Sequence, residues 1–149
     1  MDYAFAYVKE NGGIDTEKSY PYKGKNDKCH FSKADIGAQD SGYVDLPKGD
    51  ENALKAAVAT IGPISVGIVA THRTFKLYKS GVYYEAECTP RLIDRGVLVV
   101  GYGTDTEHGD FWLMKNSQGT GWGEEGYMRM ARNRNNHCGI ASWASYPLI

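Results

Sequence analysis

The sequence lacks long apolar runs and an excess of charge of either sign. It has only three cysteines, with no C-x-x-C pair among them. Seventeen Lys and Arg residues face 18 Asp and Glu residues, which leaves a formal net charge of −1 and a pI near 6.4. This balance argues against nucleic acid as a partner, because nucleic-acid binders concentrate basic charge. No apolar run reaches the length of a membrane span, which argues against a membrane partner, and Met1–Glu10 does not have the pattern of a signal peptide.

What the sequence does contain is typical of a globular domain. The 149 residues suit one domain, or one and a half small ones. Hydrophobic residues make up 42% and charged residues 23%, both near the average for folded proteins. Eighteen glycines and 11 tyrosines are high for this length and indicate many turns and strands.

Three cysteines, Cys29, Cys88 and Cys138, form no C-x-x-C spacing. An odd number means that one thiol is free or pairs with something outside the chain. A zinc site would have to use the adjacent pairs formed with His30 and His137, and adjacent residues rarely aim at one ion, so we expect no metal. We favour a disulfide between Cys88 and Cys138, which leaves Cys29 over.

Two helices are predicted. The first spans Asp2–Asn11, with Asp2 as its cap, and the second spans Asp50–Ile61, with Asp50 as its cap. The stretch 14–40 between them has no clear periodicity. The apolar residues of the second helix that follow helical spacing are Leu54, Ala57, Val58 and Ile61.

Short strands dominate the remainder of the chain. The run Gly96–Gly103 is apolar without alternation, which predicts a central strand. In Ile64–Ile68 apolar residues alternate with Ser65 and Gly67, which predicts a half-buried strand. Together with the helix at Asp50–Ile61, these strands indicate an α+β fold. The predicted strands are Ile64–Ile68, Val82–Tyr84, Val97–Val100, Phe111–Lys115 and Tyr127–Ala131.

Several motifs are too specific to arise from composition. They are Asp94–Gly103, Lys115–Tyr127, Asn136–Ser142, the ending Ser145-Tyr146-Pro147, the opening Met1–Phe5, and Tyr20-Pro21-Tyr22. In this order they closely resemble the C-terminal portion of papain-like cysteine peptidases of the cathepsin L type. The resemblance spans the whole chain without a large gap.

The resemblance implies a division of the chain. Residues 41–149 are expected to form the papain-like right-hand lobe, an antiparallel, barrel-like sheet with one packed helix. Residues 1–40 are expected to be a remnant helix of the left lobe and the belt between the lobes. The resemblance also implies that Cys88 pairs with Cys138, and that Cys29 pairs with a cysteine of a missing N-terminal lobe.

Peptide hydrolysis in this family needs a thiol, an imidazole that relays its proton, and an amide that orients the imidazole. None of the three cysteines here lies in the sequence context of the nucleophile. Arg95 stands where the family has its catalytic His, and a guanidinium cannot accept a proton near neutral pH. Asn116 occupies the position of the orienting amide. No cofactor is implied.

The residues at the positions of the family's substrate cleft also differ from those of the family. Gln118 replaces a Trp that covers the Asn–His pair in the family. Trp143 stands where cathepsin L-like enzymes have a small residue at the base of a substrate pocket, and an indole there is expected to fill much of it. The further residues that the resemblance assigns to the cleft are Met1, Gly67, Ile93 and Gly96.

Two of these residues also have plainer interpretations. Arg95 is alternatively a surface residue paired with Asp94. Asn116 is alternatively an amide that closes a turn before Ser117. Both alternatives remain open on sequence grounds.

The resemblance thus predicts a truncated, catalytically inactive relative of a cathepsin L-like endopeptidase, which lacks the half that carries the nucleophile. One alternative is a non-catalytic module that binds cystatin-like inhibitors, a propeptide or peptides. Another is half of a two-chain cysteine peptidase, joined to its partner through Cys29. The resemblance implies a lysosomal or extracellular location, whereas a true start at Met1 would imply a cytosolic one.

Overall fold

The computed structural model describes residues 1–149, which form two compact units. Unit 1 contains residues 1–44 and 147–149, and unit 2 contains residues 45–146. The division into lobes at residue 40 stays a prediction. None of the helices is long and apolar enough to cross a membrane.

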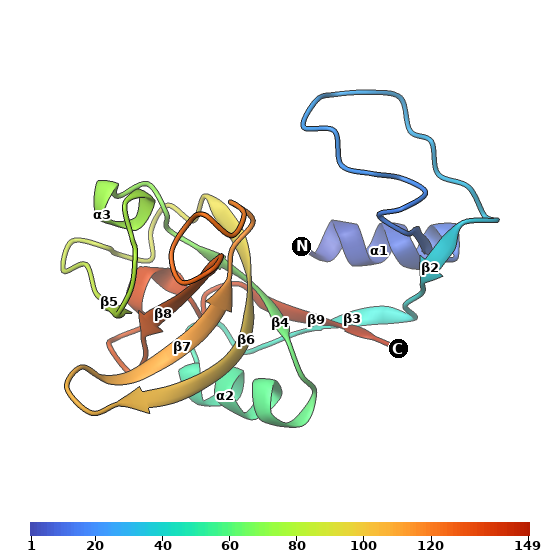
Figure 1. The fold of residues 1–149 in the computed structure, drawn as a ribbon. Helices are drawn as coiled ribbons and strands as arrows, with labels where there is room; N and C mark the ends of the chain where they lie inside the picture. The colour runs from blue at the N-terminus through green and yellow to red at the C-terminus, as the bar shows by residue number, and fades with distance from the viewer. The chain divides into compact units, whose positions relative to one another are not determined.

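Unit 1 contains helix α1 (Asp2–Asn11) and the short strands β1 (Ile14–Asp15) and β2 (Ile36–Ala38). The predicted bounds of α1 are confirmed, but the cap is Met1, so the prediction of Asp2 as the cap was wrong. The carbonyl of Met1 accepts the N–H of Ala4 at 2.8 Å, which makes Asp2 the first helical residue. β1 and β2 pair in antiparallel fashion and close the long loop between them, which Figure 1 shows in blue.

Unit 2 is built on a mixed β-sheet. Its strands are ordered β9-β4-β6-β7-β8-β5, and all neighbours are antiparallel except β5 and β8. β6 lies inside the sheet, between β4 and β7, which confirms the predicted central strand. Figure 1 shows β6 and β7 as a long curved hairpin followed by β8. The bounds are β3 Gly42–Asp45, at the boundary of the units, β4 Ile64–Ile68, β5 Val82–Tyr83, β6 Arg95–Asp105, β7 Gly109–Lys115, β8 Tyr127–Ala131 and β9 Ala144–Leu148.

β4 is more buried than its sequence predicts. Ile64, Val66 and Ile68 are fully buried, Gly67 is buried as well, and only Ser65 is half-buried. The prediction of a half-buried strand was therefore wrong. Helix α2 (Glu51–Thr60) and a 3₁₀ segment (His137–Gly139) both contact β4 and exclude water from it.

Helix α2 is capped as predicted. One carboxylate oxygen of Asp50 accepts the N–H groups of Asn52 and Ala53, each at 2.9 Å. The buried face contains Leu54, Ala57 and Val58, but Ile61 is 55% exposed. The predicted helix therefore extended one residue too far at this end, because the helix ends at Thr60 and Ile61 is its C-cap.

The core of unit 2 lies between the sheet, α2 and the short helix α3 (Arg73–Lys76). Trp112 is fully buried and Trp122 nearly so. Phe75 of α3 packs against the indole of Trp122, with 5.2 Å between the ring centroids. The core fixes β6 and β7, whose ends present the candidate site.

Candidate functional site

Arg95 is the first residue of β6, where it pairs with Ile68 of β4. Its side chain is half-buried, and its Cζ lies 6.0 Å from the centroid of the Phe75 ring. The Nε atom is buried without a hydrogen-bond partner. No ion pair joins Arg95 to Asp94, whose carboxylate instead accepts the N–H of Ala70 at 2.7 Å. The alternative prediction of a surface ion pair between Arg95 and Asp94 was therefore wrong.

Asn116 follows β7 directly, one residue beyond the pairing of Leu98 with Lys115. Its side chain is buried and uses both of its polar ends locally. The carbonyl oxygen accepts the N–H of Ser117 at 2.8 Å, and the amide nitrogen donates to the side-chain oxygen of Gln118 at 2.9 Å. Asn116 therefore closes this turn, whatever further role it has.

Four of the residues that the resemblance assigns to the cleft meet in unit 2. Gly67 pairs with Gly96 across β4 and β6, and the N–H of Gly67 donates to the carbonyl of Trp143 at 2.8 Å. A Cβ on Gly67 would lie 2.7 Å from Ile93 Cγ2 and 3.4 Å from Trp143 Cε3. The side chains of Ile93 and Trp143 thus close over Gly67, and 57% of Trp143 is exposed.

Met1, another residue that the resemblance assigns to the cleft, belongs to unit 1. It precedes the first helical residue of α1, and 38% of it is exposed. Its role in a cleft stays a prediction, as do the roles of the residues in unit 2.

The cysteines divide between the two units. Cys88 and Cys138 form a disulfide in unit 2, as predicted, and Cys29 is free and exposed in unit 1. The Sγ of Cys29 lies 3.7 Å from the hydroxyl of Tyr7 at a pocket of about 330 Å³. The backbone N–H of Phe31, followed by the Tyr7 hydroxyl, lowers the pKa of the Cys29 thiol.

His137 lies against the disulfide, with its Nε2 at 3.8 Å from the Sγ of Cys138. Its ring is buried and stacks on Tyr84 at a centroid distance of 5.0 Å. Its Nε2 lies 3.0 Å from the backbone nitrogen and 3.1 Å from the carbonyl oxygen of Glu85, whereas Nδ1 is buried without a partner. Burial is the main cause that lowers the pKa of His137.

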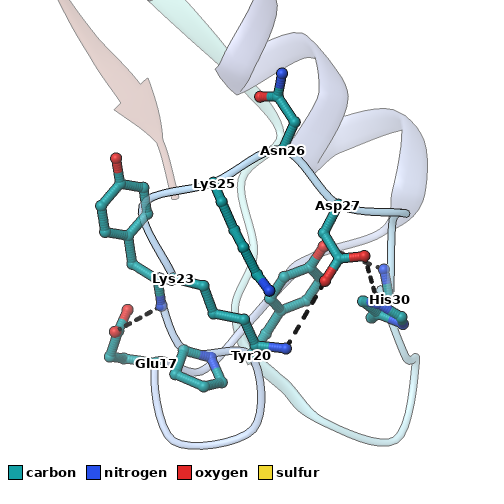
Figure 2. A pocket seen from close by; sticks show the side chains of 9 residues that line it. Glu17, Tyr20, Lys23, Lys25, Asn26, Asp27 and His30 are labelled. Atoms are coloured by element: carbon teal, nitrogen blue, oxygen red, sulfur yellow. Dashed lines mark hydrogen bonds and ion pairs between the residues drawn. The ribbon is translucent and has the colours of Figure 1, made fainter.

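A separate polar pocket of about 510 Å³ lies in the long loop of unit 1. Figure 2 shows Asp27 between the side chains of Lys23 and His30, at 3.9 and 3.8 Å from their nitrogens. The carboxylate of Glu17 accepts the backbone N–H of Tyr22 at 3.0 Å. Most charges of this pocket therefore have local partners, in contrast to Arg95.

Glu51, the first residue of α2, is a structural residue that the sequence did not single out. Its Oε1 accepts the indole N–H of Trp112 at 3.0 Å and the backbone N–H of Asn133 at 2.9 Å. Its Oε2 accepts the N–H of Asn136 at 3.1 Å. The only signal in the sequence was its position in the first turn, since its partners are distant along the chain.

No group of three or more His, Cys, Asp or Glu side chains is placed to hold a metal ion. The site is instead the start of β6 at Arg95-Gly96, which Asp94 precedes, beside β7, which ends in Lys115 and is followed by Asn116-Ser117. This strand pair in an α+β domain defines the right-hand lobe of a papain-like cysteine peptidase.

Comparison with known proteins agrees: residues 1–148 match the papain family cysteine protease domain, and the chain belongs to this family. It is 65% identical over its whole length to a "Cathepsin L-like" protein of Caenorhabditis elegans and 63% identical to "Cathepsin L" of Sarcophaga peregrina. A digestive procathepsin L 3 of Tenebrio molitor larval midgut shares its fold, with a TM-score of 0.95 and 46% identity.

The chain is shorter than these relatives. It covers 44% of each of the two sequences and 48% of the Tenebrio structure, while all of the chain is matched. The structure thus corresponds to less than half of a cathepsin L-like protein. The activity of the whole relatives is therefore a matter of proposal for this chain.

Proposed function

We propose that this chain is a cathepsin L-like domain that does not hydrolyse peptides. The observation that carries the proposal is Arg95 at the start of β6, in the position that the resemblance assigns to the catalytic His. A guanidinium stays protonated near neutral pH, so it can neither accept the thiol proton nor return it to the leaving amine. A thiol brought to this site would have no base.

The thiols of the chain support the same conclusion. Both cysteines of unit 2 are joined in the Cys88–Cys138 disulfide, so unit 2 has no free thiol. The thiolate is the nucleophilic form of cysteine, and a disulfide sulfur cannot serve in its place. The free Cys29 lies in unit 1 and outside the sequence context of the family's nucleophile.

The test combines the chain with a thiol-bearing N-terminal half taken from a cathepsin L relative and follows hydrolysis of a fluorogenic peptide. We expect no turnover from the chain alone or from the combination, and turnover when Arg95→His is combined with the same half. Arg91→His is the matched control, since it places an imidazole in the exposed loop before β6 and is expected to restore nothing. Turnover with Arg95 in place, abolished by removing the added thiol, would overturn the proposal.

A second candidate function is a binding module for cystatin-like inhibitors, a propeptide or peptides. The exposure of Trp143 beside Ile93 favours it, because exposed aromatic side chains are frequent anchors of interfaces. Titration of the chain with a cystatin-like inhibitor and with a cathepsin L propeptide tests it. Saturable binding that Trp143→Ala weakens supports this function, and the absence of saturation with both ligands contradicts it.

A third candidate is half of a two-chain peptidase. The exposed thiol of Cys29 favours it, since it is available to a partner chain. Intact mass of the protein from its source, before and after reduction, decides between a linked partner and a single chain. The disulfide also favours an oxidising compartment, and we propose a lysosomal or extracellular location on that ground.

A further inference from the structure

The buried or half-buried arginines of unit 2 differ in their partners. Arg129 pairs with Glu124 at 2.8 Å, and Arg132 pairs with Asp110 at 3.3 Å. Arg95 is half-buried and has no carboxylate within 4.0 Å. A cation that is partly removed from water without a counter-ion is costly, and an anion from outside the chain would offset that cost.

The guanidinium of Arg95 is already held in place. Its carbon lies 6.0 Å over the ring of Phe75, whose side chain is almost fully buried. Strand pairing with Ile68 fixes the backbone from which it projects. A planar fork that is held in this way suits a carboxylate, which can accept two parallel N–H bonds. Nε is buried without an acceptor, whereas the two terminal nitrogens are not among the buried unpaired atoms and have no acceptor in the protein, so their donors are open to such a ligand.

The surface next to Arg95 is open and has an apolar end. Gly96 is exposed, and a Cβ built there would meet no atom within 4 Å. Across the strand pair lies Gly67, over which Ile93 and the exposed Trp143 close. The exposed Gly96 thus lets a peptide backbone approach the strand beside Arg95, and the exposed indole of Trp143 covers the buried Gly67 on the paired strand.

We propose that Arg95 binds a carboxylate of a peptide whose adjacent apolar side chain lies on Trp143. The inference rests on the proposed function, since it gives the residue in the position of the catalytic His a binding role in a non-catalytic domain. The carboxylate comes from an Asp or Glu side chain or from the C-terminus of the peptide. A single guanidinium without a second cation matches the single charge of a carboxylate.

The test uses four short peptides and isothermal titration calorimetry with the 149-residue chain. Two blocked peptides differ only in Glu or Gln next to a Phe, the third has Lys at that position, and the fourth has Gln and a free C-terminal carboxylate. We expect the Glu peptide to bind at least about tenfold more tightly than the Gln peptide, and the Lys peptide to bind least. If the fourth peptide matches the Glu peptide, the C-terminal carboxylate is an equally good source of the charge.

Variants then assign the effect to Arg95. Arg95→Gln is expected to abolish the preference for Glu over Gln, and Arg95→Lys to keep only part of it, because an ammonium lacks the fork. Arg91→Gln, which removes an exposed cation four residues earlier, should leave the preference unchanged. Trp143→Ala should weaken the Glu and Gln peptides by the same factor, since it removes only the apolar contact.

The pH dependence gives a readout that a purely structural role would not move. With Arg95 the preference for Glu is constant between about pH 5.5 and 8, because both charges persist there. Arg95→His should show the preference only below about pH 6.5, where an imidazole is protonated. Equal affinities of the Glu and Gln peptides for the unmodified chain would overturn this inference. They would leave the proposed function standing, because that fails only if peptide bonds are cut with Arg95 in place.

Discussion

The carboxylate of Glu51 joins three segments that are far apart in the sequence. It accepts the indole N–H of Trp112 from β7 and the backbone N–H groups of Asn133 and Asn136 from the loop after β8. Both asparagines have left-handed backbones, with φ of 60° and 55°, so the loop needs external support. We expect Glu51→Ala to destabilise unit 2 strongly.

The magnitude follows from the burial of the three donors. Trp112 is fully buried, so its N–H finds no water when Glu51 is removed, which costs about 1–3 kcal/mol. Asn133 is exposed and Asn136 half-buried, so water replaces part of their bonds at about 0.5–1 kcal/mol each. The sum is about 2–5 kcal/mol, or a decrease in Tm of roughly 4–20 °C for a chain of this size.

Urea unfolding followed by tryptophan fluorescence measures this loss. Glu107→Ala is the matched control, because Glu107 is an exposed carboxylate in the turn between β6 and β7. In the double-mutant cycle of Glu51→Ala with Trp112→Phe, we expect a coupling of about 1–2 kcal/mol, since the second change removes the buried donor. If Glu51→Ala unfolds within about 0.5 kcal/mol of the control, or the coupling vanishes, the reasoning is refuted.

Two further predictions concern the pH dependence of the free energy of unfolding and the cost of replacing glycines that have a positive φ. Below about pH 6.5 the unfolded chain takes up a proton at His137 that the folded chain resists, so the free energy of unfolding should fall until the lowered native pKa of His137 is reached. Urea unfolding between pH 7.5 and 5 should show this slope in His108→Gln but not in His137→Gln, and a slope that survives in His137→Gln contradicts the assignment. Gly119→Ala should cost roughly 1–2 kcal/mol for its positive φ alone, because a Cβ there meets nothing. Gly123→Ala should cost about 1–3 kcal/mol more, because its Cβ would collide with the carbonyl oxygen of Tyr127, and equal Tm values for the two variants would refute this.

Local signals in the sequence predicted the elements that local forces define. Asp50 and the apolar spacing after it place α2 within one residue at each end, because capping and helical periodicity act over a few residues. β9 was not predicted, because it contains Pro147 and its apolar residues do not alternate with polar ones. It forms through pairing with β4, which lies about 80 residues earlier in the sequence. β3 and α3 are too short to leave a periodic signal.

The site shows the same division. The identity of Arg95 and the position of Asn116 could be interpreted through the motifs around them. The sequence could not show that the guanidinium of Arg95 has no ion-pair partner, because that depends on which carboxylates the fold brings near it. The contact of His137 with Glu85 could not be predicted either, because it joins residues 52 positions apart.

The Cys88–Cys138 bond encloses β6, β7 and β8, and its two cysteines have a sequence separation of 50. The exposed turns at 106–108 and 117–121 lie within this covalent ring. A protease that nicks either turn therefore opens the ring without releasing a fragment, and the cut chain keeps its mass, apart from one water, on a gel run without reductant. Such a cut therefore stays hidden on a gel until a thiol is added.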